Sequence, residues 1–241
     1  MIRLGYACIN NTLQKQKPKI GCNRGMIKRT FAAKGTDYAS QLAQQNTADI
    51  IKILRWNEAH DIKVFRMTSC LFPWGSEYEL EDLKDFEQIQ KNLCEAGQYA
   101  IDHGHRLSFH PGPFNILSSP KEHVVRNAYI DLEMHGKIMD LMGMPRSPQA
   151  KINIHVGASY GDREAALLRF CKNYDGLSDS VKTRLTVEND DKGNLYSTKM
   201  LYDGVSFRIG IPIVFDSHHH ELGPQDVSYK EAFYMARETW Q

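Results

Sequence analysis

Apolar residues follow two alternating patterns along this chain. Short runs rich in β-branched residues predict six strands. These strands span residues 2–8, 62–68, 105–110, 151–157, 184–189 and 210–216. Between them, apolar residues three and four positions apart predict helices. The helical patterns cover residues 42–56, 83–96, 120–142, 162–173, 197–205 and 229–240.

A strand followed by a helix, repeated six times, predicts βαβ units and a parallel sheet. No low-complexity linker interrupts residues 1–241, so we predict a single domain over that range. Six units fit either a doubly wound sheet or an incomplete (β/α)8 barrel. The positions of polar residues favour one of the two.

Residues of metal-ligand type stand at the ends of four successive predicted strands. They are His110, His155, Glu188 and Asp216, with His219 shortly after the last. In a barrel these ends converge at one mouth, whereas in an open sheet they form a row with neighbours about 5 Å apart. A ring focuses on one point more readily than a row. We therefore predict an α/β fold of the TIM-like (β/α)8 barrel type, truncated at the C-terminal end to about six βα units.

Imidazole and carboxylate groups without thiolates suit zinc, manganese or iron at a catalytic site. A bridging carboxylate holds two cations about 3.5–4 Å apart, which fits metal-assisted phosphodiester hydrolysis. A single histidine at a strand end is more often a hydrogen-bonded core or loop residue, so the prediction depends on the whole set. In the internal triplet His218, His219 and His220, at most two members point inward because neighbouring side chains diverge.

A basic segment follows the first predicted strand. Its cations are Lys15, Lys17, Lys19, Arg24, Lys28, Arg29 and Lys34, and no acidic residue precedes Asp37. A cationic loop on the mouth that carries the metal ligands suits a phosphate backbone, and a merely solvated loop is the alternative. The apolar cluster after the second strand either stacks on a base or packs on the barrel rim. This cluster consists of Leu71, Phe72, Pro73 and Trp74.

Overall composition narrows the function classes. The net charge of +1 excludes a uniformly basic surface, so a local patch must hold any polyanion. Five scattered cysteines without a CxxC pair disfavour a disulfide framework and a thiolate zinc site, and they favour a reducing cytoplasm. The sequence has no apolar run of about 18 residues and no signal-peptide pattern, so we expect no membrane association.

Six sequence blocks carry a resemblance to a known family. They are RLGYACIN, FRMTSCLFPW, LSFHPGPF, INIHVGASYGDRE, LTVENDD and VFDSHHHELGP, which together cover essentially the whole chain. With these blocks the sequence resembles the UV damage endonucleases, whose fold is related to endonuclease IV and the xylose isomerase-like TIM barrels. The resemblance implies nicking of damaged double-stranded DNA immediately 5′ to cyclobutane dimers and 6-4 photoproducts. It also implies up to three divalent metal ions, most often Mn²⁺.

The resemblance implies roles for individual residues. The implied metal ligands are His110, His155, Glu188, Asp216 and His219, with Glu77 where the family carries a histidine. The implied catalytic residues are Glu188, His155, Asp216 and Tyr6. The expected DNA contacts are Tyr6, Asn10, Pro113 and Phe114, to which the basic segment adds Lys15, Lys17, Arg24 and Lys28.

Three departures from the family pattern change these expectations. After its HPG motif the family has Gln and an aromatic residue that fill the gap opposite a lesion, whereas this chain has Pro113 and Phe114. Phe114 keeps a stacking ring, but the amide is lost. Glu77 offers oxygen in place of an imidazole nitrogen. The family's last two strands bring a histidine, a modified lysine and a glutamate that have no counterpart here, so we expect an incomplete metal cage.

Two alternative functions stay open at this point. A sugar isomerase or epimerase of the same barrel superfamily uses similar Glu, Asp and His ligands and has less need of a basic loop. A truncated fragment that binds damaged DNA without nuclease activity would follow from the missing ligands. The sequence indicates no obligate protein partner.

Overall fold

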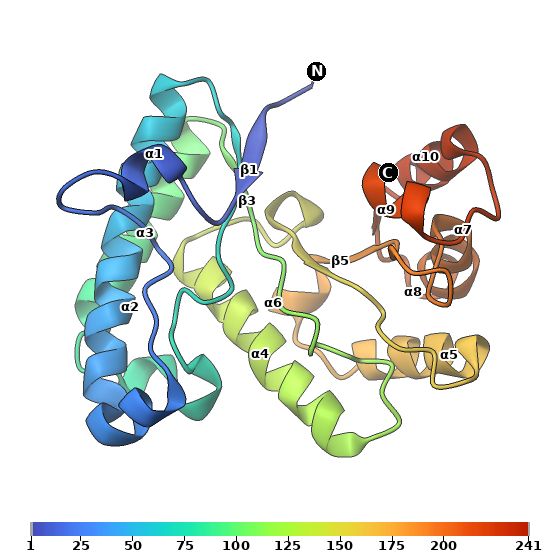
Figure 1. Cartoon of the computed structure of the whole chain (residues 1–241), viewed down its shortest axis with the longest axis horizontal. Coiled ribbons are helices and arrows are strands. Elements are labelled where there is room, and N and C mark those ends of the chain that lie inside the picture. The colour runs from blue at the N-terminus through green and yellow to red at the C-terminus, as the bar shows by residue number, and fades with distance from the viewer. Residues whose placement is uncertain (1, 241) are drawn as a thin grey trace. The chain divides into compact units, whose positions relative to one another are not determined.

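A computed structural model describes residues 2–240 of the chain (Figure 1). These residues form two compact units. The first unit comprises residues 2–110 and 134–150, and the second comprises residues 111–133 and 151–240. The single domain expected from the sequence stays a prediction.

The described part of the first unit contains a three-stranded parallel sheet in the order β1-β2-β3. Its elements are β1 (Gly5–Ala7), α1 (Asn11–Gln14), α2 (Lys28–Ala59), β2 (Val64–Arg66), the 3-10 helices η1 (Gly75–Glu77) and η2 (Leu80–Asp82), α3 (Phe86–Asp102), β3 (Arg106–Ser108) and the 3-10 helix η3 (Pro148–Ala150). Helix α4 (Glu122–Leu141) begins in the second unit and ends in the first.

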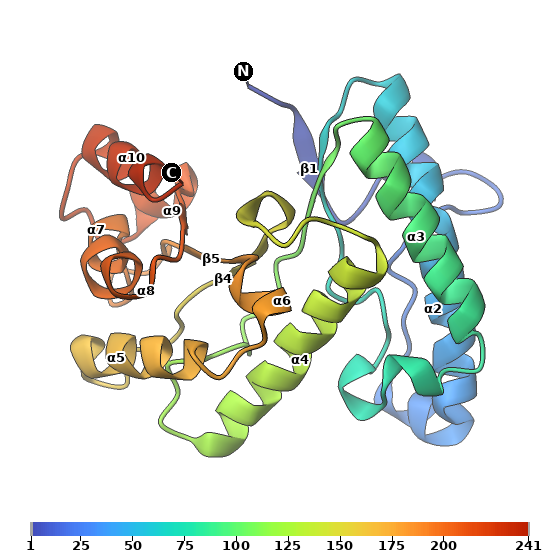
Figure 2. The ribbon, with the colours of Figure 1, turned by 180° about the vertical axis from the view of Figure 1, so that it is seen from behind.

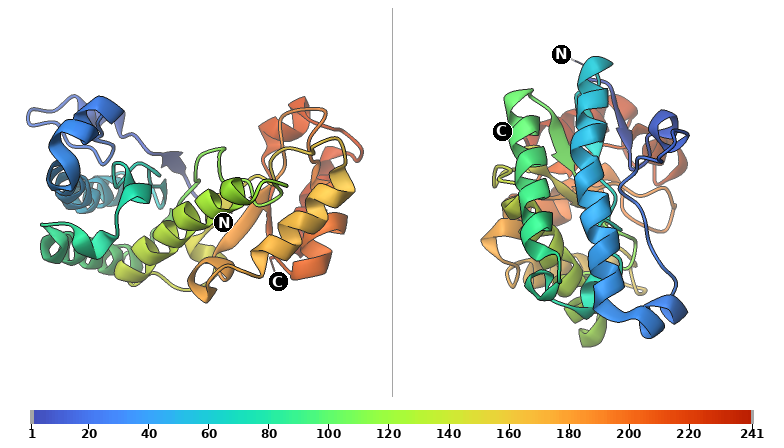
Figure 3. Two further views of the ribbon diagram at one scale, coloured as in Figure 1. Left: turned by 90° about the horizontal axis from the view of Figure 1, so that it is seen from below. Right: turned by 90° about the vertical axis from the view of Figure 1, so that its left-hand side faces the viewer.

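Helices α2 and α3 lie side by side in the first unit (Figures 1 and 3). Helix α2 is interrupted at Gly35, whose φ of +63° lies in the left-handed region that glycine adopts without strain. Gly97 lets α3 approach the end of α4, because an added Cβ would overlap the carbonyl oxygen of Met142. The core of this unit includes Ile50, Leu54, Phe65, Leu93 and Leu107.

The second unit contains a second three-stranded parallel sheet among its described residues, in the order β4-β5-β6. Its elements are β4 (Ile152–Ile154), α5 (Arg163–Tyr174), α6 (Asp179–Lys182), β5 (Leu185–Glu188), α7 (Thr198–Leu201), the π-helical turn η4 (Tyr202–Ser206), α8 (Phe207–Ile209), β6 (Ile213–Val214), α9 (Ser217–Leu222) and α10 (Tyr229–Glu238). Figure 2 shows these helices from behind.

Strict alternation along β4 and β5 gives this second sheet two unlike faces. Successive strand side chains point to opposite faces, and Asn153 pairs in register with Thr186. One face carries Ile152, Ile154, Leu185 and Val187, which belong to the core of the unit. The other face carries Asn153, Thr186 and Glu188. The polar face therefore ends at Glu188, where β5 ends.

The six predicted strands are present, and each is shorter than predicted. β6, for example, covers Ile213–Val214, because Gly210 ends α8 with a φ of +70° and Pro212 has no N–H to donate. The predicted helices are also present. One prediction was wrong in detail: α2 begins at Lys28, so the basic segment is helical rather than a loop from that residue onward.

The apolar cluster after β2 packs against the first unit. Phe72 is buried, and the Trp74 ring stacks on Phe31 with centroids 5.5 Å apart. The Trp74 indole N–H donates to the Met26 carbonyl oxygen at 3.0 Å. Packing on the rim, one of the two interpretations of this cluster, is therefore the one that the structure supports.

No helix within residues 2–240 is both long enough and apolar enough to cross a membrane. The cytoplasmic location expected from the cysteine content stays a prediction.

Candidate metal centre

The Glu188 carboxylate is held at the end of β5 by two neighbouring polar side chains. Asn153 on β4 donates from its amide nitrogen to Glu188 Oε2. Thr186 donates from its hydroxyl to Asn153 Oδ1 at 2.7 Å. Because Oδ1 accepts from Thr186, the amide NH₂ must face Glu188. All three side chains are buried, so this chain of hydrogen bonds fixes the carboxylate.

Asp216 and His219 come from the start of α9. Asp216 is the N-cap residue, and its Oδ1 accepts the His219 backbone N–H at 2.9 Å. Asn189 holds the Asp216 backbone through two hydrogen bonds, one to its carbonyl oxygen and one from its N–H, both 2.9 Å. His219 Nδ1 donates to the Asn189 carbonyl oxygen at 2.9 Å and is 3.4 Å from Glu188 Oε1. This tautomer leaves the lone pair on His219 Nε2.

Glu188, Asp216 and His219 form a cluster within the second unit. Each offers one ligand atom, and these atoms lie within 4.8 Å of one another. Two carboxylates this close, one of them buried, repel each other unless a positive charge compensates them. Carboxylate oxygen with imidazole nitrogen is a donor set that divalent metals accept. The residues therefore fit a divalent cation.

His155 lies beside this cluster, just after β4. Its Nδ1 is 3.1 Å from Asp190 Oδ1, and its Nε2 is 3.9 Å from Glu188 Oε1. A carboxylate that accepts the Nδ1–H orients the ring and leaves Nε2 for a metal. Burial lowers the pKa of His155, but the hydrogen bond to Asp190 and the charges of Glu188 and Asp191 outweigh burial and raise the pKa above its usual value.

A cavity of about 480 Å³ adjoins these residues within the second unit. His155, Asp190 and His219 line it, together with Pro113 and its neighbours in the loop that follows β3. Phe114 in the same loop is 83% exposed. An exposed aromatic ring thus stands on a loop that borders the cavity and the metal cluster.

Tyr6 and Asn10 belong to a hydrogen-bonded network in the first unit. The Tyr6 hydroxyl donates to Asn57 Oδ1 at 2.7 Å and accepts from Asn10 Nδ2 at 2.9 Å. Asn10 Oδ1 accepts the Leu13 N–H and caps α1. Burial raises the pKa of Tyr6 although these hydrogen bonds oppose it. Tyr6 is therefore a neutral phenol at pH 7, and the buried Asn10 amide is engaged in internal contacts.

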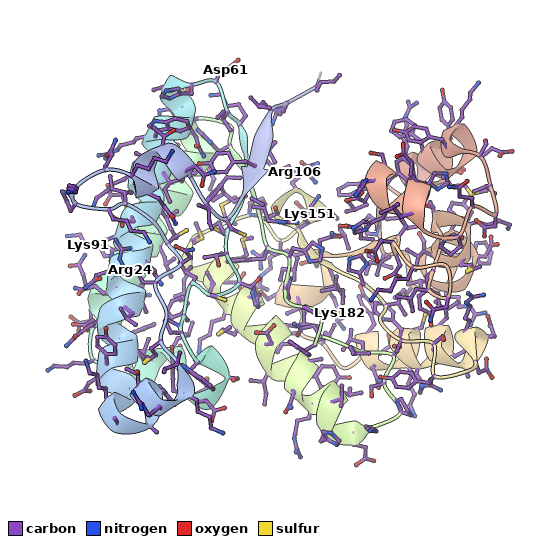
Figure 4. All side chains as sticks on the ribbon, viewed as in Figure 1. Arg24, Asp61, Lys91, Arg106, Lys151 and Lys182 are labelled. Carbon is purple, nitrogen blue, oxygen red and sulfur yellow. The ribbon has the colours of Figure 1, made fainter. Side chains whose placement is uncertain are left out.

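The predicted DNA-binding cations are of two kinds. Lys15, Lys17 and Lys28 are exposed. Arg24, which is labelled in Figure 4, is engaged internally: its Nη2 is 2.7 Å from Asp49 Oδ2 on α2, and its guanidinium also donates to two backbone carbonyls of its own segment. Arg24 therefore anchors the basic segment to α2, and its predicted DNA contact stays a prediction.

Two other predicted metal ligands belong to the first unit. His110 follows β3 and is half-buried, and its carbonyl oxygen accepts the Ser69 hydroxyl at 2.8 Å. Glu77 is exposed in η1. Their part in metal binding stays a prediction.

The histidine triplet divides as side-chain geometry requires. His218 is exposed, and His220 is buried with its ring 5.5 Å from that of Phe215. Within the second unit, His219 is the member of the triplet that joins Glu188 and Asp216.

Four residues that position this site were not predicted from the sequence: Asn153, Thr186, Asn189 and Asp190. Asn153 could have been found from the sequence, because a polar residue between two isoleucines of a buried strand needs a polar partner. The run from Glu188 to Asp191 was recognised, but which of its members faces a histidine depends on the turn after β5.

Parallel βα units whose strand ends bring together imidazole and carboxylate groups define a barrel protein with a candidate metal site at the strand ends. A solved structure, that of SacUVDE, has this fold with a TM-score of 0.88 and 29% sequence identity, covering 100% of this chain and 78% of that one. The predicted TIM-like barrel class is thereby confirmed. The chain belongs to the UV-endonuclease UvdE family, whose sequence model matches residues 2–241.

Curated relatives agree with this assignment. A UV-damage endonuclease of Schizosaccharomyces pombe is 36% identical over 245 residues, which cover 99% of this chain and 40% of that protein. A UV DNA damage endonuclease of Bacillus cereus is 32% identical over 242 residues, covering 100% of this chain and 74% of that protein. The chain thus spans about two-fifths of the length of the fungal relative. A D-psicose 3-epimerase from Clostridium cellulolyticum H10, at 13% identity and a TM-score of 0.54, shares the fold alone.

Proposed function

We propose that this chain is a metal-dependent endonuclease that nicks UV-damaged double-stranded DNA. The observation that carries the proposal is the cluster of Glu188, Asp216 and His219, with His155 beside it, in a chain whose relatives are named UV-damage endonucleases. We further propose that the cut lies immediately 5′ to cyclobutane dimers and 6-4 photoproducts.

Glu188, Asp216, His219 and His155 would hold the cation through carboxylate oxygens and imidazole nitrogens. When bound, a divalent cation supplies the Lewis acidity that polarises a phosphoryl oxygen and lowers the pKa of water. We propose Mn²⁺ as this cation, with up to three sites once the His110 and Glu77 ligands are included. The chain's own contribution is a rigid donor set, because Asn153, Asn189 and Asp190 restrain the ligands.

The exposed lysines Lys15, Lys17 and Lys28 are suited to phosphate contacts, which position a duplex without reading its sequence. Phe114 and Pro113 are suited to stacking in the gap that a distorted lesion leaves, because the ring is exposed beside the cavity. We propose that Tyr6 contacts DNA through its aromatic ring and not through its hydroxyl, because the hydroxyl is already bonded to Asn57. A lesion that is already poorly stacked costs less to displace than intact DNA, which favours damaged substrates.

The decisive experiment measures nicking of a duplex oligonucleotide that contains one cyclobutane dimer, with Mn²⁺ present. We expect Glu188→Gln to lose at least about 100-fold in rate, because the substitution removes the central negative charge of the site. Thr183→Val is the matched control, since Thr183 is the exposed C-cap residue of α6 in the same unit and its hydroxyl bonds only the Asp179 carbonyl oxygen among described contacts. A Glu188→Gln rate within a few-fold of wild type would contradict the proposal.

A gel-shift experiment on the same duplex separates cleavage from binding. Replacing Lys15, Lys17 and Lys28 by alanine should weaken binding uniformly and reduce its salt dependence, whereas Glu188→Gln should leave binding in place. Binding of damaged duplex by the wild type without any cleavage would favour the second function considered from the sequence, a fragment that recognises damage but does not cut. Epimerisation of a free ketose would support the sugar-isomerase alternative, whose only support is the shared fold with the D-psicose 3-epimerase.

A further inference from the structure

Side chains of Thr239 and Trp240, the two residues that follow α10, cover the side of β6 that faces away from β5. β6 pairs with β5 through the Val187 N–H, which donates to the Pro212 carbonyl oxygen at 3.1 Å. In a parallel ladder the N–H and C=O of one residue point the same way, and those of the next residue point the opposite way. The backbone groups of Ile213, which follows Pro212, therefore point away from β5.

Both outward groups of Ile213 are nevertheless bonded. Its N–H donates to the Thr239 hydroxyl oxygen at 2.9 Å, and its carbonyl oxygen accepts the Trp240 indole N–H at 2.7 Å. The Thr239 hydroxyl in turn donates a hydrogen bond to the Ala236 carbonyl oxygen at 2.6 Å. Thr239 thus supplies an acceptor and Trp240 a donor, in the places where a neighbouring strand would supply them.

This contact is close in sequence to the metal cluster. Asp216 lies three residues after Ile213, and β6 ends at Val214, so the segment that reaches the Asp216 ligand is short. The Asn189 side chain, which follows β5, holds the backbone of Asp216 in this segment through two hydrogen bonds. On its outer side Thr239 and Trp240 supply the bonds just described.

We infer that Thr239 and Trp240 are positioning residues, which clamp β6 from outside and so set the place of Asp216 and His219 in the metal site. The inference rests on the proposed metal binding by that site. Among the described residues, β6 without these two contacts would keep its backbone bonds to β5 alone, and we infer that Asp216, three residues after Ile213, would then shift. Groups hydrogen-bonded directly to a metal ligand typically contribute 10–100-fold to metal affinity, so for residues that act one step further out we expect the lower end of that range.

The test is a titration of the purified, metal-stripped full chain with Co²⁺, followed by visible absorption, and with Mn²⁺, followed by calorimetry. Thr239→Val keeps the shape of the side chain and removes the hydroxyl, and Trp240→Phe keeps an aromatic ring and removes the indole N–H. We expect each to weaken binding by roughly tenfold and to lower the intensity of the Co²⁺ spectrum. Thr239→Ser, which restores the hydroxyl, should return both readouts to the wild-type values.

Thr183→Val is again the matched control, because its hydroxyl also bonds a carbonyl one turn earlier at a helix end and has no described contact with β6. Wild-type affinity and spectrum in both Thr239→Val and Trp240→Phe would overturn the inference. Equal losses in Thr239→Val and Thr239→Ser would also overturn it, because the hydroxyl would then not be the cause. If the wild type itself binds no metal, the proposed metal site fails, which is a different outcome from failure of the clamp. Should Thr239→Val not fold, Trp240→Phe decides alone.

Discussion

Replacing Asn153 by alanine tests how the Glu188 carboxylate is held. The substitution removes the donor on Glu188 Oε2 and the acceptor of the Thr186 hydroxyl. Asn153, Thr186 and Glu188 are all nearly inaccessible to solvent, so water does not readily replace the lost partners.

The expected cost follows from the kind of bond. A hydrogen bond to a charged group contributes about 1.5–3 kcal/mol, and a neutral one about 0.5–1.5 kcal/mol. Loss of both predicts a destabilisation of about 2–4.5 kcal/mol. For a chain of this length each kcal/mol lowers Tm by about 2–4 °C, so Asn153→Ala should unfold roughly 4–18 °C below the wild type.

A double-mutant cycle with Glu188→Gln isolates the part due to charge. The glutamine still accepts the Asn153 hydrogen bond but carries no charge, so Asn153→Ala should cost about 1 kcal/mol less on that background. Urea unfolding of the metal-free proteins, followed by circular dichroism, measures the free energy of unfolding of the wild type, both single variants and the double variant. If the cost is the same on both backgrounds to within about 0.5 kcal/mol, Asn153 does not stabilise the carboxylate through its charge.

Three further substitutions test other contacts. Asp190→Asn removes the charge that faces His155 Nδ1, so Mn²⁺ affinity measured by calorimetry should fall about tenfold, and an unchanged affinity would exclude the orienting role. Burial raises the pKa of Asp49, but hydrogen bonds from two cations and a backbone N–H outweigh burial and lower the pKa. Such a carboxyl stabilises the fold above its unfolded pKa of about 3.9 and loses this contribution as the pH falls through its lower folded pKa. Asp49→Asn should therefore flatten the acid side of a plot of Tm against pH, and an unchanged slope would contradict the assignment. Gly97→Ala should lower the free energy of unfolding by more than about 1 kcal/mol, because the added Cβ overlaps the Met142 carbonyl oxygen. Urea unfolding measures this, and a midpoint equal to that of the wild type would refute it.

The spacing of apolar residues predicted the helices and strands of this fold well, because an element that buries one face repeats apolar residues with its own structural period. β4 and β5 alternate strictly, and α3 repeats its apolar residues every three or four positions. Element ends were less predictable, since they depend on contacts beyond the local pattern. The break of α2 at Gly35 and the end of α8 at Gly210 are set by backbone conformations that a glycine permits but does not require.

The candidate site shows the same division between local and distant determinants. A reader of the sequence can predict Glu188 and Asp216, because each follows an apolar strand and parallel strands end together. Asn153 on β4 restrains the Glu188 carboxylate, and Asn189, which directly follows β5, restrains the Asp216 backbone. Whether Asn153 meets Glu188 depends on strand register, because a shift by one residue would turn Asn153 into the apolar core.

The basic segment shows why a count of cations in the sequence overestimates the positive charge available at the surface. From the sequence, Arg24 and Lys17 are equivalent cations on one loop. In the structure the Arg24 guanidinium pairs with the buried Asp49, whereas Lys17 is exposed. A cation that is neutralised inside the fold adds little to the potential that a phosphate meets outside it. If the segment binds DNA as proposed, we expect the attraction to come from its exposed lysines, whereas Arg24 holds the segment in place against α2.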